Sequence, residues 1–150
     1  MGRRAALARR FLLCEALAMT LSTDQALSAA QGAANRGDLN GAADILVAAF
    51  QRDQTNPLIP LLLAQIHKLA GSDEGEAESL AIALAIDPYC WPALLARASR
   101  HERQGRPREA AQVWRDALRI APPKSHWPPL YAGELAHAER EVNRFTQALE

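Results

Sequence analysis

The side chains best able to do chemistry in this chain are its histidines. His67 and His101 lie 34 residues apart, and His137 stands two positions before Glu139 in an H-x-E sequence. Imidazole and carboxylate groups bind zinc when they reach one coordination sphere. On a helix, residues two apart point in different directions, so His137 and Glu139 are not expected to chelate one ion. The positions of the histidines in the sequence therefore predict no metal site.

Motifs that carry catalysis are missing from the sequence. It contains no phosphate-binding glycine loop, no H-E-x-x-H zinc motif and no G-x-S-x-G nucleophile motif. Cys14 and Cys90 form no C-x-x-C pair and are expected to act as small hydrophobic residues. The sequence therefore predicts a protein that is not an enzyme and has no catalytic or cofactor-binding residues.

The composition favours helices and argues against a nucleic-acid surface. Apolar residues make up 49% of the 150 residues but aromatic residues only 5%, and alanine is abundant. Alanine is the strongest helix former. The 17 basic side chains are balanced by 17 acidic ones, whereas nucleic-acid binding normally needs a positive face. We expect a helical protein that binds no nucleic acid.

The N-terminal stretch MGRRAALARRFLLCEALAMTLS predicts an amphipathic helix rather than a signal peptide. Arg9, Arg10 and Glu15 interrupt the apolar run that a signal peptide needs. No uncharged apolar run approaches the ~20 residues that cross a bilayer. We expect a soluble, cytoplasmic protein that does not bind membranes.

Residues of the same kind recur every 34 positions. Gly37, Gly71 and Gly105 keep this step. Apolar columns keep it as well: Ala30, Ala64 and Ala98; Ala49, Ala83 and Ala117; Leu27, Leu61 and Leu95; Leu46, Leu80 and Trp114. Each period places two helical segments around its glycine, which ends the first of them. The pattern predicts stacked helix–turn–helix units whose alanines let helices approach closely.

A 34-residue helix–turn–helix unit with small residues at fixed places and a terminal proline resembles the tetratricopeptide repeat. The third unit matches best, through Leu94, Ala98, Gly105, Ala110, Trp114, Ala117 and Pro122. The pattern is broken at Glu76, where a small residue is usual, and at Gln54, where proline is usual. The resemblance implies an all-α, right-handed α-solenoid of three repeats, over residues 23–56, 57–90 and 91–124.

Two flanking helices complete the expected single domain over residues 1–150. Terminal repeats need capping, so we expect an N-terminal cap at residues 4–20 and a capping or linker helix at 128–150. The second of these carries one apolar stripe at helical spacing: Tyr131, Leu135, Ala138, Val142, Phe145 and Leu149. Such a stripe can dock on the last repeat or pair two copies of the chain as a homodimer.

The segment PPLYAGELAHAEREVNRFTQALE resembles the N-terminal part of bacterial aspartyl/asparaginyl β-hydroxylase-like proteins. In that family the repeats precede a jelly-roll Fe(II)/2-oxoglutarate dioxygenase domain. The family's iron-binding His-x-Asp and distant His are not in this chain. The resemblance implies an alternative function, as the repeat segment of a dioxygenase whose catalytic domain lies beyond residue 150 and serves as the partner.

The tetratricopeptide resemblance implies that the first helix of each repeat lines a concave, partner-binding face. The residues expected there are Leu27, Gln31, Leu58, Leu61, Gln65, Lys68, Leu95, Ser99, Glu102 and Arg103. A leucine strip edged by Gln31 and Gln65 suits an amphipathic helix or an extended apolar peptide, whose backbone the amides can bond. The alternative is that the leucines pack on neighbouring helices or on the chain's own ends.

Some tetratricopeptide domains hold the C-terminal carboxylate of chaperones in a Lys/Asn/Asn/Lys/Arg clamp. The matching positions here are Leu27, Gln31, Leu62, Pro92 and Ala96, which offer no cation. We therefore expect a protein–protein or inter-domain interaction scaffold that binds a peptide or helix but not a chaperone tail.

Overall fold

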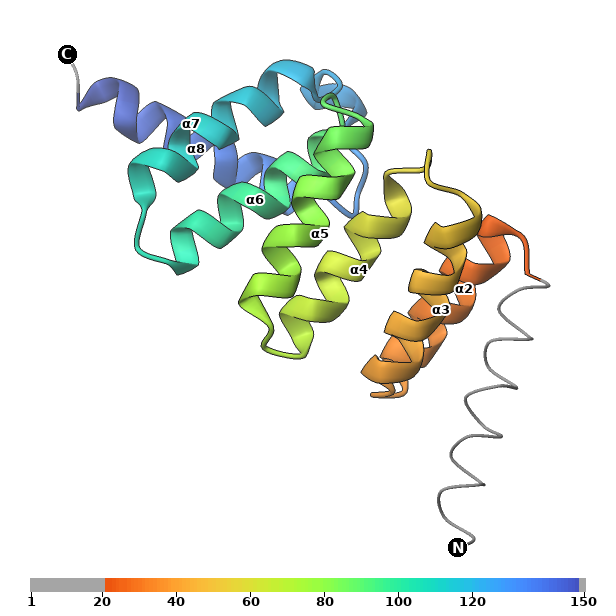
Figure 1. Cartoon of the computed structure of the whole chain (residues 1–150). Coiled ribbons are helices and arrows are strands. Elements are labelled where there is room, and N and C mark those ends of the chain that lie inside the picture. Colours follow the sequence, from red (N-terminus) through yellow and green to blue (C-terminus); the bar gives the residue numbers. More distant parts are fainter. Residues whose placement is uncertain (1–20, 149–150) are drawn as a thin grey trace, which may run out of the picture. The chain divides into compact units, whose positions relative to one another are not determined.

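The computed structural model of the chain describes residues 21–148 (Figure 1). In that range the backbone forms seven α-helices and one short 3-10 helix, with no strand. This confirms the predicted all-α helical-repeat class. The cap expected at residues 4–20 lies outside the described residues, as do Cys14 and Leu149. Within the described range, no helix has both the length and the apolar character needed to cross a membrane.

Packing divides the chain into two compact units, residues 1–86 and 87–150. Unit 1 holds α2 (Thr23–Asn35), α3 (Leu39–Arg52), α4 (Leu58–Leu69) and α5 (Asp73–Ile86). Unit 2 holds α6 (Trp91–Arg103), α7 (Pro107–Ile120), the 3-10 turn η1 (Lys124–His126) and α8 (Ala132–Gln147). The single domain expected over residues 1–150 stays a prediction.

Unit 1 consists of two helical hairpins, α2–α3 and α4–α5, with α3 packed against α4 (Figure 1). One core cluster joins α2, α3 and α4: Ala26, Ala30, Ala33, Ala42, Leu46, Ala49, Ile59 and Ile66. The alanines recur at helical spacing and let the backbones approach closely. Leu46 and Ile59 are fully buried and fill the remaining space, so truncating either to alanine is expected to cost about 2–5 kcal/mol.

The turn inside each repeat has the same backbone structure three times. Gly37, Gly71 and Gly105 have φ values of 81°, 78° and 72°, a left-handed conformation that glycine adopts without steric penalty. In all three turns the amide after the glycine donates to a carbonyl five residues back, at 2.9 Å. This bond is the Schellman closure of a helix C-terminus. The predicted 34-residue period is thus the spacing of this turn.

In unit 2, α7 packs against both α6 and α8. Trp114 of α7 is 1% exposed, and its ring meets the ring of His137 edge-on at 5.5 Å between centroids. Leu135 and Ala138 of α8 are fully buried. These two residues of the predicted apolar stripe thus pack within unit 2, where α8 contacts α7; docking of the whole stripe as a cap stays a prediction. Pairing of two copies through this helix stays a prediction.

Side-chain contacts fix the proline-rich segment that leads into α8. Trp127 Nε1 donates to the carbonyl of Pro122 at 3.1 Å. Lys124 Nζ lies 5.5 Å from the centre of the Trp127 ring and 3.0 Å from a carboxylate oxygen of Glu139 on α8. The contact between Lys124 and Glu139 connects this segment to the middle of α8.

Candidate functional site

One face of α4 carries leucine side chains that are exposed to solvent. Leu58 is 47% exposed and Leu69 is 66% exposed. They are eleven residues apart, which is close to three helical turns, so both point in nearly the same direction. Leu62, half-buried, and Gln65, exposed, lie between them at helical spacing. We call this set, Leu58, Leu62, Gln65 and Leu69, the α4 stripe.

The partner-binding residues predicted in unit 1 differ in exposure. Leu61 is only 4% exposed, and Leu27 is half-buried against the core cluster. Lys68 is exposed. Gln31 is exposed too, and its amide Nε2 donates to Asn35 Oδ1 at 3.1 Å. Of the residues predicted in unit 1, those whose side chains are exposed to a partner are therefore Leu58, Gln65, Lys68 and Gln31.

The partner-binding residues predicted in unit 2 all lie on α6. Leu95 is fully buried, Ser99 is half-buried and Arg103 is exposed. Glu102 makes contacts within the unit, because its Oε1 accepts from Trp114 Nε1 at 3.0 Å and lies 2.9 Å from His137 Nε2. A role of the ten predicted residues in partner binding stays a prediction, and burial argues against direct contact by Leu61 and Leu95.

Sequence reasoning missed Leu69, the last residue of α4. A signal was available, because Leu69 shares a helical face with Leu58 and Gln65. The 34-residue columns did not reveal it, since the equivalent positions one period earlier and one period later hold Asn35 and Arg103. An apolar residue that does not repeat is therefore found from the face of its own helix rather than from the period.

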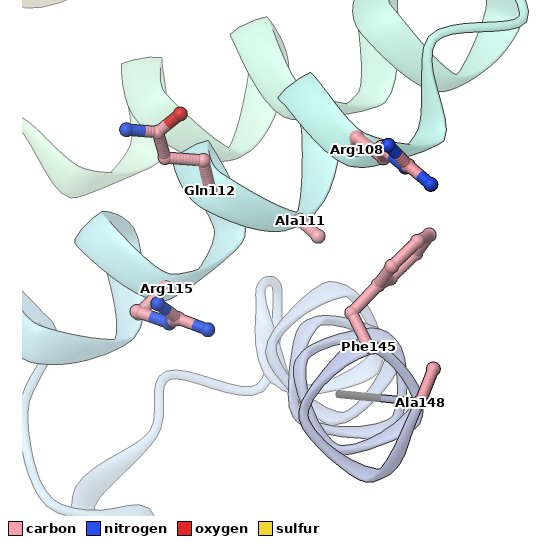
Figure 2. Close-up of a pocket in the computed structure, with 6 residues that line it drawn as sticks. All are labelled: Arg108, Ala111, Gln112, Arg115, Phe145 and Ala148. Atoms are coloured by element: carbon pink, nitrogen blue, oxygen red, sulfur yellow. The ribbon is translucent and has the colours of Figure 1, made fainter. Parts of the chain in front are cut away.

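Unit 2 also carries a hollow of about 430 Å³ between α7 and α8 (Figure 2). Ala111, Phe145 and Ala148 give it an apolar lining, and the Phe145 ring extends toward α7. Arg108, Gln112 and Arg115 of α7 complete it. We call this the arginine hollow. An apolar side chain beside a carboxylate or phosphate group matches its chemistry.

Residues with metal-binding chemistry meet at one place in unit 2. His137 and Glu139 contact different partners, Glu102 and Lys124 respectively, and it stays a prediction that they do not chelate one ion. Sequence reasoning missed that Glu141, one turn beyond His137, joins Glu102 and His137. Ligand atoms of these three residues all lie within 4.8 Å of one another.

Burial shifts the pKa of several groups toward their neutral forms. Burial raises the pKa of the Cys90 thiol, so this thiol is a poor nucleophile at neutral pH. Burial also raises the pKa of Tyr131, with the nearby Glu134 carboxylate adding to the effect. The pKa of His101 is lowered, first by burial and then by repulsion from Arg100.

Comparison with known proteins finds similarity in structure rather than in sequence. No family model matches the sequence, and no relative is found among curated proteins. The first TPR domain of Spaghetti (RPAP3), bound to the HSP90 peptide SRMEEVD, is 16% identical; the match covers 85% of this chain and 94% of that one, with a TM-score of 0.66. The Arabidopsis OM64 TPR domain is 18% identical over 85% of this chain and 98% of that one, also at 0.66.

A third structure, the Sgt2 TPR domain from Aspergillus fumigatus, is 17% identical over 88% of this chain and 87% of that chain, with a TM-score of 0.65. The chain has the tetratricopeptide-repeat fold. In this fold the predicted columns of alanine and leucine are the packing positions between helices, and the predicted resemblance is confirmed. The narrower resemblance to hydroxylase-like proteins receives no support from these matches.

Proposed function

We propose that this tetratricopeptide-repeat chain is a non-catalytic protein-interaction scaffold and that the α4 stripe binds an apolar segment of a partner. The observation that carries the proposal is the exposure of Leu58 and Leu69 on one face of α4, while Ile59 and Ile66 of the same helix are buried. A continuous apolar surface is typical of a contact site, and half-buried Leu62 lies between the two exposed leucines in the α4 stripe.

The chemistry of the stripe suits a short amphipathic helix or an extended apolar peptide. Covering the exposed parts of Leu58 and Leu69 is expected to contribute about 1 kcal/mol each. Gln65 lies between them and has both a donor and an acceptor for the backbone of a peptide. Lys68 and Gln31 are exposed in the same unit and are proposed to add specificity at the edge of the contact.

The charge of the matching positions supports a neutral ligand. The RPAP3 domain is bound to a peptide that ends in Glu-Glu-Val-Asp. The positions of this sequence that match a carboxylate clamp hold Leu27, Gln31, Leu62, Pro92 and Ala96. Because none of them is a cation, an acidic tail would lose its water without gaining an ion pair. The proposed ligand is therefore apolar and neutral.

A displayed peptide library tests this proposal without knowledge of the natural partner. Random 12-residue peptides are selected against the wild-type chain, and the best binders are measured against a Leu58→Asp/Leu69→Asp variant. Both leucines are exposed, so the variant is expected to fold. We expect leucine-rich, uncharged binders whose affinity for the variant falls at least about tenfold, because two carboxylates replace the apolar contact.

The matched control is Val47→Asp, since Val47 is 46% exposed on α3 and lies outside the α4 stripe. This change is expected to leave peptide affinity within about twofold of wild type, as is usual for a surface substitution away from the contact. Selected peptides that bind the double variant as tightly as wild type would show that the stripe is not the contact surface.

A further inference from the structure

We propose that Glu102, His137 and Glu141 form a binding site for a divalent transition-metal ion of the zinc class. The site is independent of the proposed peptide contact and lies entirely within unit 2. It uses one carboxylate from α6 and one imidazole and one carboxylate from α8. Their candidate ligand atoms all lie within 4.8 Å of one another.

The spacing of two ligands along α8 places them side by side. His137 and Glu141 are four residues apart, so they lie on the same face of the helix, one turn apart. Glu102 approaches that face from α6, and its two carboxylate oxygens lie 2.9 and 3.0 Å from His137 Nε2. Two ligands of one tetrahedral zinc ion lie about 3.3 Å apart. An ion therefore replaces the hydrogen bond between Glu102 and His137, and the Glu102 carboxylate moves out of the line of that bond so that the ion can reach Nε2.

Trp114 holds two of the ligands in their orientation. Its indole Nε1 donates to Glu102 Oε1 at 3.0 Å, and its ring meets the His137 ring edge-on. Trp114 is itself 1% exposed, so it provides a rigid support. Bonds of this kind from outside the ligand set fix the direction in which a metal-binding carboxylate points. Trp114 is thus a positioning residue for the proposed site.

Charge and access also fit a divalent cation. The two carboxylate ligands supply two negative charges, which one divalent ion balances. All three side chains are partly exposed, so an ion and a completing water molecule can enter. Arg144 Nη1 lies 3.7 Å from Glu141 Oε2, but its side chain is 74% exposed and can turn to solvent. The imidazole favours zinc, cobalt or nickel over calcium and magnesium, which prefer oxygen ligands alone.

Zinc titration of the full chain, with any affinity tag removed, tests the site. We expect one saturable zinc ion per chain and a rise in unfolding temperature when zinc is added to wild type. His137→Gln and Glu141→Gln are each expected to weaken zinc binding at least about tenfold, because each removes a direct ligand. Cobalt(II) serves as a second probe, since its visible absorption reports the loss of each ligand.

Glu139→Gln is the control, because Glu139 lies on the same helix but pairs with Lys124. It is expected to change zinc affinity less than about twofold. Circular dichroism shows whether each variant keeps its helices, and Glu141→Gln leaves both members of the hydrogen bond between Glu102 and His137 unchanged. Absence of saturable binding to folded wild-type protein up to ~1 mM zinc would overturn the proposal. Equal zinc binding by wild type, His137→Gln and Glu141→Gln would overturn it as well, because the ion would then be held elsewhere.

Discussion

The α4 stripe of unit 1 and the arginine hollow of unit 2 differ in the chemistry that they offer a partner. The stripe presents leucine side chains and one amide, without a charge among its four members. The hollow has an apolar lining beside Arg108 and Arg115. Both units are built from helical hairpins that close with the same glycine turn. The shared turn maintains the fold, and the outward-facing residues, which the packing does not constrain, give each unit a different surface.

The largest expected effect is a difference in stability between a substitution in the α4 stripe and one on the buried face of α4. Leu61 is 4% exposed and Leu58 is 47% exposed, although they are three residues apart on α4. Leu61→Asp is expected to lower the free energy of unfolding by about 3–5 kcal/mol, because it buries a charge in place of an apolar side chain. Leu58→Asp is expected to stay within about 0.5 kcal/mol. Urea unfolding followed by circular dichroism measures the free energy of unfolding of both variants. Equal losses would show that Leu58 and Leu61 do not differ in their contribution to the core.

The next prediction tests whether the left-handed glycine turn contributes equally to stability in the two units. Gly71→Ala in unit 1 and Gly105→Ala in unit 2 are each expected to cost about 1–2 kcal/mol, because an L residue is strained in the left-handed conformation. A β-carbon at either glycine would meet no atom within 4 Å, so the loss comes from the backbone alone. Gly133→Ala, which lies in α8 at an open position, is the control and is expected to be neutral or slightly stabilising. A Gly71→Ala protein as stable as wild type would contradict the account of the turn.

A smaller effect contrasts the charges of the two surfaces. A helical probe peptide of glutamate and leucine is expected to bind the arginine hollow, and Arg108→Ala/Arg115→Ala is expected to weaken it about fivefold in low salt. The loss is expected to shrink as salt is raised, since the two arginines are solvent-exposed. Fluorescence anisotropy of the labelled peptide measures the affinity. The affinity of the neutral peptides selected for the α4 stripe should not change in this variant. An equal loss of affinity for both peptides would show that they bind the same surface.

The smallest effect is a pH dependence carried by His101 in unit 2. Burial lowers the pKa of His101 in the folded protein from its usual 6.5, and its buried Nδ1 has no hydrogen-bond partner among the described residues. Below about pH 6.5 the unfolded chain takes up this proton before the folded protein does. The stabilising contribution is therefore full above that pH and is lost as pH falls toward the lowered pKa.

Thermal unfolding at pH 7.5 and pH 5.5 measures this effect. Wild type is expected to lose more stability on acidification than His101→Gln, which cannot take up the proton. His126→Gln, at an exposed position of the segment before α8, is the control and should behave like wild type. If His101→Gln and wild type lose the same amount, His101 does not carry the dependence.

Much of the fold could be predicted because it is repeated along the sequence. Gly37, Gly71 and Gly105 mark the turns, and Trp114 and Leu135 lie in the apolar stripes that become buried. Exposure was harder to predict, since Leu58 and Leu61 are both leucines on one helix and only the neighbouring helices decide which is covered.

The group of Glu102, His137 and Glu141 was missed for a similar reason. The i, i+4 spacing within α8 can be read from the sequence. The approach of Glu102 cannot, because it depends on how α6, α7 and α8 pack.

A map of amide chemical shifts in the full chain, recorded as a selected neutral peptide is added, tests whether the α4 stripe is the contact surface. The proposed contact predicts that the largest shifts fall on residues 58–69 of α4 and that the residues lining the arginine hollow change little. Largest shifts at Arg108–Arg115 and around Phe145, with α4 unchanged, would contradict it.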